Sequence, residues 1–257
     1  MKMHTKLLLL LLSGFLIGAC SKQPSLLDMD EWDLVWISDS SGWDVAQVYA
    51  AMIEEDTGIP VKVIHDWMGT LRAGDVYAAL EGEPTADAKL AALADKIREA
   101  EIVIVYGNPE GSTQGDPADW NCVPGNRLYV NQCPAFSTYT EHLQGIYAAI
   151  FELRNGQPTI VRAFDAYNPL IARFKEQGVY EECKACWAMY NSAIRQAAAE
   201  FNIPVAGVSE AWNGPDWDMD PVALGYTKDG IHPNEEGARV IAHALRVLGY
   251  DPVTVGR

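Results

Sequence analysis

The sequence predicts an α/β fold built around one doubly wound parallel sheet with helices on both faces. Short runs rich in β-forming residues alternate five times with longer helical stretches, which is the pattern of parallel strands joined by crossover helices. The 257 residues suit one α/β domain, 49 % of them are apolar, and no internal repeat or low-complexity tract divides the chain. We therefore expect a five-stranded parallel sheet in one domain that covers residues 32–257.

The expected strands are short and rich in Val and Ile. The uninterrupted apolar run at 102–106 is of the kind that a parallel sheet buries on both faces. The five strands are expected at 33–38, 61–64, 102–106, 159–164 and 205–208.

Helices are expected between these strands. Thr85 can cap a helix in which Leu90 and Ile97 share one face. The other helices are expected near 43–55, 71–80, 137–153, 180–201 and 234–248. Two long connections remain, 107–134 and 210–228, and a loop as long as the first is usually functional or tied down.

The start of the chain is expected to lie outside the domain. Lys2 and Lys6 give a basic start, and the apolar run that follows ends near Ile17. This run is too short to span a bilayer as a typical helix. It therefore predicts the hydrophobic region of a signal peptide.

Small residues then lead into Cys20, which resembles the lipobox of bacterial lipoproteins, whose cysteine is acylated and becomes the first residue of the mature protein. Two or more acyl chains give stable anchoring. We expect a signal peptide at 1–19 and a lipid-anchored tether at 20–31. This places the protein in the bacterial cell envelope, facing the periplasm or the cell exterior. A plain secretory signal cleaved near Ala19 is the alternative.

Four further cysteines, an even number in an exported chain, predict two disulfides. A bond between Cys122 and Cys133 would close a short loop, and this is the pairing that the spacing favours. Cys183 would then pair with Cys186, although both pairs could instead cross between the two segments. A CxxC redox motif or half of a zinc site are the remaining alternatives for the second pair, and no second CxxC supports zinc.

The charge of the chain argues against a nucleic-acid partner, and the absence of certain motifs argues against a cofactor or a metal. Acidic residues number 35 against 19 basic ones, the net charge is −16, and no Lys/Arg cluster occurs. Such a chain repels phosphate backbones, so no nucleic-acid partner is expected. The sequence holds no G-x-S-x-G elbow, Walker A, G-x-G-x-x-G or H-E-x-x-H motif, and we expect no cofactor and no metal.

A His–Asp pair precedes the last expected helix. Asp229 stands three residues before His232, across a glycine, and Pro233 keeps the histidine out of helical geometry. An aspartate so placed can accept the imidazole Nδ1–H and stabilise the imidazolium that forms during proton transfer. The alternative is a helix-capping loop with a surface histidine.

A serine turn follows the first expected strand. Ser40 and Ser41 lie where the strand passes into a helix, next to helix N–H groups that can stabilise an oxyanion. The alternative is simple capping, because Ser and Asp are common N-cap residues.

The second and third strands also end in groups that can donate hydrogen bonds. Gly69, after the second strand, can present a bare backbone N–H, and Gly74 is the fallback for this role. Asn108, after the third strand, offers a side-chain amide, although Gly-Asn-Pro is also strong turn chemistry. In parallel α/β sheets the site lies at the carboxyl ends of the strands, where all these residues stand.

Taken together, these segments resemble the four blocks of the SGNH, or GDSL-like, hydrolase family. The family's Ser, Gly, Asn and His correspond here to Ser40, Gly69, Asn108 and His232, with Asp229 three residues before the histidine. The resemblance covers roughly residues 33–248 and implies a flavodoxin-like three-layer α/β/α sandwich. It also implies a serine esterase with a Ser-His-Asp triad and an oxyanion hole of Ser, Gly and Asn donors.

The resemblance is incomplete at two blocks. The family's Gly-Asp-Ser-Leu reads Ser38-Asp39-Ser40-Ser41 here, so Ser41 competes as the nucleophile. Pro109 replaces the Asp that usually follows the Asn. A non-catalytic binding protein on the same fold, or an acyltransferase to a sugar acceptor, is therefore the alternative to an esterase. The expected substrate is a small-molecule, polysaccharide or lipid ester.

The remaining histidines and the tryptophans have less specific interpretations. His142 and His243 fall in expected helices and are expected to be structural or solvated, whereas His65 ends a strand and could line the pocket. Several tryptophans lie near the site and could form an apolar or sugar-stacking wall, although ordinary packing is the favoured reading. They are Trp43, Trp67, Trp120, Trp212 and Trp217.

Overall fold

The computed structural model describes residues 25–69, 71–108 and 136–253. The expected signal peptide, the acylated Cys20, and Cys122, Cys133 and Trp120 of the long connection lie outside the described residues. None of the helices in the described ranges combines the length and the apolarity that crossing a bilayer requires.

Five parallel strands form the sheet, in the order β2-β1-β3-β4-β5. This is the flavodoxin-like order of a doubly wound fold. The strands are β1 (Trp32–Ile37), β2 (Val61–His65), β3 (Ile102–Val105), β4 (Ile160–Phe164) and β5 (Val205–Ala206). The predicted fold class is confirmed, and every predicted strand is present.

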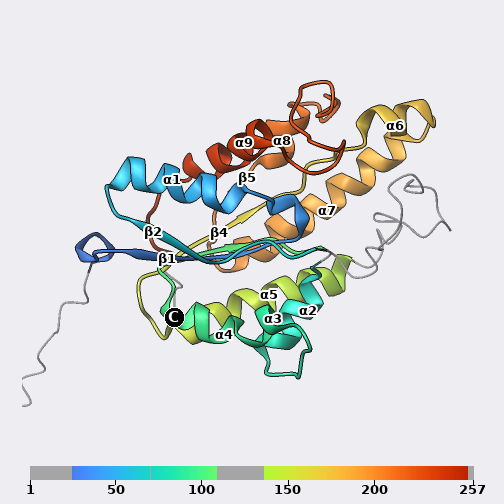
Figure 1. The fold of residues 1–257 in the computed structure, drawn as a ribbon. Coiled ribbons are helices and arrows are strands. Elements are labelled where there is room, and N and C mark those ends of the chain that lie inside the picture. The colour runs from blue at the N-terminus through green and yellow to red at the C-terminus, as the bar shows by residue number, and fades with distance from the viewer. Residues whose placement is uncertain (1–24, 70, 109–135, 254–257) are drawn as a thin grey trace, which may run out of the picture.

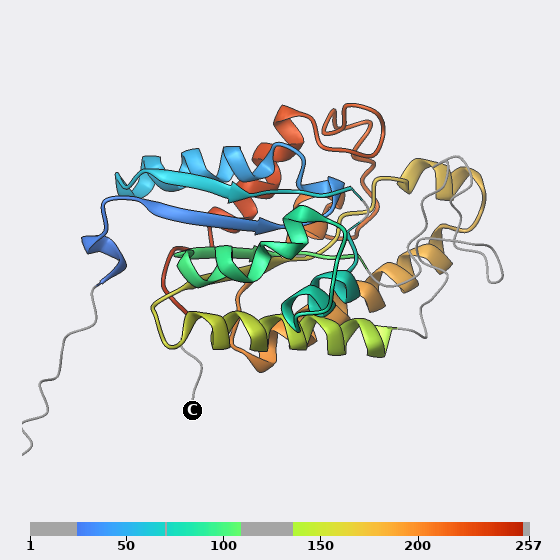
Figure 2. The ribbon, with the colours of Figure 1, turned by 60° about the horizontal axis from the view of Figure 1, so that its bottom comes forward.

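Helices cover both faces of the sheet (Figures 1 and 2). On one face lie α1 (Val45–Thr57), α8 (Val208–Asn213) and α9 (Glu235–Arg246). On the other lie α2 (Ala73–Leu80), α3 (Ala88–Ala91), α4 (Leu93–Glu99) and α5 (Phe136–Arg154). The long helix α7 (Tyr180–Glu200) packs on α5 and follows the short α6 (Ile171–Glu176).

The sequence prediction missed α6 and α8, each of six residues. A helix this short does not complete the apolar period on which the prediction depends. Val208, which was expected to end the last strand, instead begins α8, so β5 is only two residues long. The chain therefore leaves the sheet earlier than predicted.

The first helix also begins later than predicted, at Val45 rather than near residue 43. A 3-10 turn, η2 (Ser40–Gly42), lies between β1 and the helix, and Asp44 adopts a left-handed conformation with φ of 60°. Aspartate is one of the few non-glycine residues that tolerate this conformation. Ser40 therefore sits in a separate turn and not at the N-terminus of α1.

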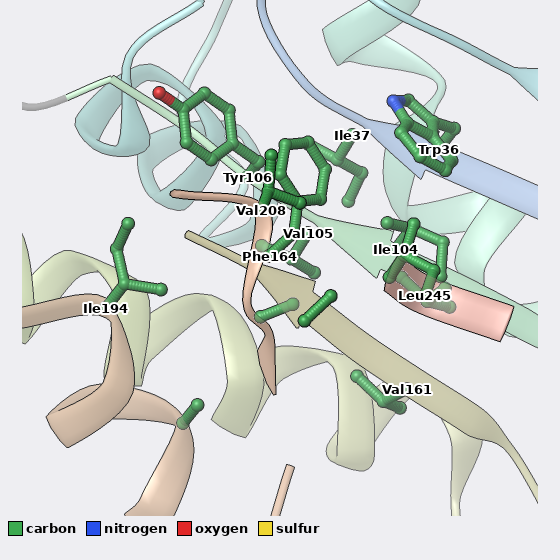
Figure 3. Close-up of a cluster of buried hydrophobic side chains, with 14 of the residues drawn as sticks. Trp36, Ile37, Ile104, Val105, Tyr106, Val161, Phe164, Ile194, Val208 and Leu245 are labelled. Atoms are coloured by element: carbon green, nitrogen blue, oxygen red, sulfur yellow. The ribbon is translucent and has the colours of Figure 1, made fainter. Parts of the chain in front are cut away.

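Buried apolar side chains pack in a cluster around the strands (Figure 3). Phe164 of β4 stacks on Tyr106 with ring centroids 4.8 Å apart and contacts Trp36 of β1 at 5.6 Å. All three rings are buried. They lie near the carboxyl ends of three neighbouring strands, so the loops that leave these ends start from fixed positions.

Candidate active site

The carboxyl ends of the strands point to one edge of the molecule, as the arrowheads of β1 and β2 show (Figure 2). The strand order places β1 between β2 and β3, so the loops that follow these three strands are neighbours. The predicted site residues Ser40, Gly69 and Asn108 lie on these loops. The segment with Asp229 and His232 lies between α8 and α9.

Asp229 and His232 form a pair. The imidazole Nδ1 lies 2.6 Å from Asp229 Oδ2, and Asp229 Oδ1 accepts the backbone N–H groups of Ile231 and His232 at 3.0 and 2.8 Å. Partial burial raises the pKa of Asp229, but the bonds from His232 and Ile231 together outweigh it and leave the pKa below its ordinary value. An ionised Asp229 accepts a hydrogen bond from the Nδ1–H group, so the neutral imidazole has its unprotonated nitrogen at Nε2, which can take up a proton.

The loop that carries this pair is fixed to the rest of the domain. Tyr167 donates its hydroxyl to the carbonyl of Ile231 at 2.8 Å, and the Lys228 N–H donates to the carbonyl of His232 at 3.0 Å. Asn234 caps α9 through the N–H of Gly237 at 3.0 Å. The helix-capping interpretation of this segment is therefore correct for Asn234, but it does not account for the Asp229–His232 bond.

The turn that carries Ser40 is built around Asp39. Its Oδ1 accepts the backbone N–H of Ser41 at 2.8 Å and the Ser41 hydroxyl at 2.5 Å. Gly42 closes the turn so tightly that a Cβ at this position would lie 1.9 Å from Ser38 Oγ. Only glycine fits here, because the turn packs directly on the buried Ser38.

Asn108 joins this turn from the end of β3. Its Nδ2 donates to Asp39 Oδ2 at 2.6 Å, and both residues are buried. The backbone of Asn108 is held on both sides, since its N–H donates to Leu71 and its carbonyl accepts from Ala73, each at 2.9 Å. Burial raises the pKa of Asp39 and outweighs the bonds from Ser41 and Asn108.

The loop that carries Gly69 is joined to the same turn by a hydrogen bond of the preceding residue, Met68. The N–H of Met68 donates to the carbonyl of Ser38 at 2.7 Å, which fastens the loop after β2 to the end of β1. Among the described residues, the N–H groups of Ser40 and Gly69 have no hydrogen-bond acceptor. The fallback residue, Gly74, lies inside α2 instead of on the loop.

Trp43 links the serine turn to the histidine loop. Its ring centroid lies 5.9 Å from that of His232, and it stacks on Trp67 at 4.6 Å. The charge of His232 acts on Asp39, where it opposes the rise in pKa that burial causes. The structure therefore brings the predicted Ser, Gly, Asn and His–Asp residues to one edge of the sheet.

Sequence reasoning missed the roles of Asp39 and Lys228. Asp39 reads as an ordinary N-cap in the sequence, and its contact with Asn108 joins residues 69 positions apart. The Lys228 ammonium lies 3.0 Å from the Trp43 ring centroid, in a loop that the sequence left without structure. The only signal for either residue was its position next to a predicted catalytic residue.

The other histidines and tryptophans divide into residues beside the predicted site and residues of the core or the surface. His142 packs on Tyr77 within the helical layer, and His243 is exposed on α9, as expected. Trp212 is fully buried and stacks on Tyr167, so it belongs to the core, and Trp217 is half-buried away from the His232 ring contacts. Trp43 and Trp67 remain as the half-buried tryptophans beside the predicted site.

Cys183 and Cys186 are both buried near the start of α7. The favoured bond between these two cysteines stays a prediction, as does the alternative pairing with Cys122 and Cys133, which lie outside the described residues.

Comparison with known proteins identifies the fold. No protein-family model and no curated protein sequence matches this chain. Solved structures do match it. A protein from Parabacteroides merdae classed as a GDSL-like lipase aligns with a TM-score of 0.58 at 12 % identity, over 86 % of this chain and 97 % of that one. The chain has the SGNH/GDSL-like hydrolase fold.

Two acetyl xylan esterases share this fold with the chain. One, named AlAXEase, aligns with a TM-score of 0.53 at 15 % identity, over 84 % of this chain and 99 % of that one. The other, from Geobacillus stearothermophilus, aligns with a TM-score of 0.52 at 15 % identity, over 88 % of this chain and 100 % of that one. At these identities the likeness establishes the fold, whereas the chemistry has to be argued from the site.

His65, at the end of β2, yields a prediction about stability. Its side chain is 3 % exposed, and within the described residues neither ring nitrogen has a hydrogen-bond partner. Burial, assisted by the charges of Lys96 and Lys89, lowers its pKa from 6.5 to about 4. The unfolded chain therefore takes up this proton first as the pH falls. The contribution of His65 to the free energy of unfolding is therefore fully present above pH 6.5. It falls by at most about 3 kcal/mol as the pH drops towards 4.

Urea unfolding of the wild type and His65→Phe at pH 7.5 and pH 4 tests this. The stability of the wild type relative to His65→Phe should fall at acid pH. His243→Gln, which removes an exposed histidine, serves as the control. An equal loss of stability in the wild type and His65→Phe would show that the pKa of His65 is the same in the folded and unfolded states.

Proposed function

We propose that this chain is an exported serine hydrolase that cleaves a carboxylic ester. One observation carries the proposal: the Asp229–His232 pair and the Ser40 turn lie at the same sheet edge, where the ring of Trp43, directly after the turn, is 5.9 Å from the His232 ring. The paired imidazole supplies a base, the turn supplies a hydroxyl, and the strand-end loops supply hydrogen-bond donors.

In this mechanism His232 Nε2 takes the proton of the Ser40 hydroxyl while Ser40 Oγ attacks the ester carbonyl carbon. Asp229 holds the imidazole in the required tautomer and stabilises its positive charge. The tetrahedral intermediate collapses, the C–O bond to the alcohol breaks, and His232 returns the proton to the leaving alcohol. Water then attacks the acyl-serine by the same route, which releases the carboxylic acid and restores Ser40.

The oxyanion of the tetrahedral intermediate requires donors at the strand ends. We assign this role to the backbone N–H groups of Ser40 and Gly69 and to the side-chain amide of Asn108. The Asn108 side-chain amide donates to Asp39 Oδ2 at 2.6 Å. That bond also orients the amide, so the donor is positioned before substrate binds.

The hydrogen bonds of the turn support Ser40 over Ser41 as the nucleophile. The Ser41 hydroxyl is committed to Asp39 Oδ1 at 2.5 Å, and this bond belongs to the cap of the turn. A serine whose hydroxyl is held by a carboxylate within its own turn is a structural residue. Ser40, which precedes it, is half-buried at the turn and remains the candidate.

The acyl group and the alcohol are open within the ester class. The solved structures of similar fold include acetyl xylan esterases, so acetylated carbohydrate belongs in the first substrate panel beside short acyl esters and lysophospholipids. Product analysis with and without a sugar acceptor separates hydrolysis from acyl transfer. Formation of an acylated sugar would show that the reaction is acyl transfer and not hydrolysis.

Reaction with a fluorophosphonate probe tests the nucleophile. Wild-type protein should label at Ser40, Ser40→Ala should not label, and Ser41→Ala should still label, because only the Ser40 hydroxyl is activated by His232. Mass spectrometry of the labelled peptide locates the adduct. If the wild-type protein stays unlabelled while folded, the chain is a binding protein on this fold and not an enzyme.

Replacement of Asn108 tests the oxyanion hole. Asn108→Ala should lower kcat by about 10²–10³, the usual effect of losing one such donor. Asn191→Ala is a matched control, since Asn191 is also buried and makes two hydrogen bonds, both to the backbone of Ala166. Steady-state kinetics on an ester, with circular dichroism to check folding, should show the loss for Asn108 alone. Equal losses in both variants would assign Asn108 a structural role.

The lipid anchor at Cys20 is part of the same proposal and is supported by the lipobox-like segment before it. The full-length chain expressed in a bacterium should fractionate with membranes, and Cys20→Ala should move it to the soluble fraction or stop its processing. Mass spectrometry of the mature N-terminus should find an acylated cysteine. An unmodified N-terminus near residue 20 would instead support the plain secretory signal.

A further inference from the structure

Three side chains from three different loops form one stack at the proposed site. The Lys228 ammonium lies 3.0 Å from the centroid of the Trp43 ring, and the Trp43 and Trp67 rings stack at 4.6 Å with an interplanar angle of 14°. Lys228 belongs to the loop of Asp229 and His232. Trp43 follows the Ser40 turn, and Trp67 lies just before Gly69 in the chain.

Trp43 occupies the centre of this stack and contacts the proposed base. Its ring lies 5.9 Å from the His232 ring at an angle of 53°, so it packs against the imidazole while Lys228 and Trp67 contact the indole. The left-handed conformation of Asp44, with φ of 60°, directs the chain away directly after Trp43. A backbone held in this sparsely populated region is a feature that surrounding contacts must maintain.

Lys228 has an electrostatic reason to stay on the ring. The face of a tryptophan ring attracts a cation, and Asp44 and Asp229 add negative charge around the same ammonium group. The backbone of Lys228 donates to the carbonyl of His232 at 3.0 Å. A side chain that rests on Trp43 while its backbone holds His232 connects the two directly.

We propose that Lys228 and Trp43 are positioning residues, and that the Lys228–Trp43–Trp67 stack sets the placement of the His232 imidazole relative to the Ser40 turn and the Gly69 loop. The inference rests on the proposed function, because it concerns the geometry of that site. Neither residue takes part in bond making. They act by keeping the base within reach of the serine hydroxyl, where a misplacement of about 1 Å can cost about 10²-fold in rate.

Kinetics of Lys228 variants test the proposal. Lys228→Met keeps the length of the side chain and removes the charge, and we expect kcat to fall about ten-fold while KM changes less than about two-fold. Lys228→Arg should recover most of the activity, because a guanidinium also stacks on an indole ring. The matched control is Lys175→Met, which removes another cation–π contact, over the Tyr180 ring at 5.1 Å, and should keep wild-type kcat.

Wild-type kcat in Lys228→Met would overturn the proposal. So would an Arg variant as slow as the Met variant, because charge on the ring would then not matter. A loss carried by KM with kcat retained would also overturn it, since Lys228 would then contact substrate and not position the base.

A second readout does not depend on activity. In the proton NMR spectrum, the Cε1–H signal of His232 should carry a ring-current shift from Trp43. This signal should move in Trp43→Leu and in Lys228→Met but not in Lys175→Met, whereas the signal of the exposed His243 should move in none of them. A His232 signal that stays in place in both site variants would overturn the stack as a positioning device. Absence of fluorophosphonate labelling alongside the expected shifts would reject only the proposed function.

Discussion

The arrangement of the site depends on the buried carboxylate of Asp39. A buried charge is costly unless hydrogen bonds satisfy it, and Asp39 receives them from Ser41 on its own turn and from Asn108 at the end of β3. Burial still raises its pKa, so these bonds compensate only in part. The turn and the Asn108 loop are therefore coupled, because separating them would leave buried polar groups unpaired on both sides.

The sheet makes this coupling possible. β1 and β3 are neighbours, and the ladder between them continues to their ends, where the N–H of Tyr106 donates to the carbonyl of Ile37 at 2.7 Å. The aromatic cluster around Phe164 supports both strands from below the site. The loops can then hold a serine turn and an amide side by side at one edge, because the strands that carry them are buried and hydrogen-bonded to each other.

The unusual Ser38-Asp39-Ser40-Ser41 segment also finds a physical explanation. Ser38 stands where a glycine is usual in the resembling family, and here its hydroxyl accepts the Trp36 indole N–H at 2.7 Å while its carbonyl accepts the N–H of Met68. Gly42, a little further on, provides the close approach to Ser38 that a side chain would prevent. The departure from the usual block thus comes with a hydrogen-bond network that fixes this turn to the buried end of β1.

The sequence by itself determined the five parallel strands and their order along the chain, the positions of Ser40, Gly69 and Asn108 on loops that follow strands, and the place of Asp229 and His232 before the last helix. These features are written in local patterns: buried apolar runs of Val and Ile, and polar or glycine residues directly after them. Only the tertiary structure decided which strand-end groups meet. The Asp39–Asn108 bond, the Lys228–Trp43 contact and the short helices α6 and α8 depend on neighbours distant in the chain or on segments too short to show a period. A contact between distant residues leaves no periodic trace in the sequence, since either partner alone has an ordinary local role as a cap, a loop residue or a packed ring.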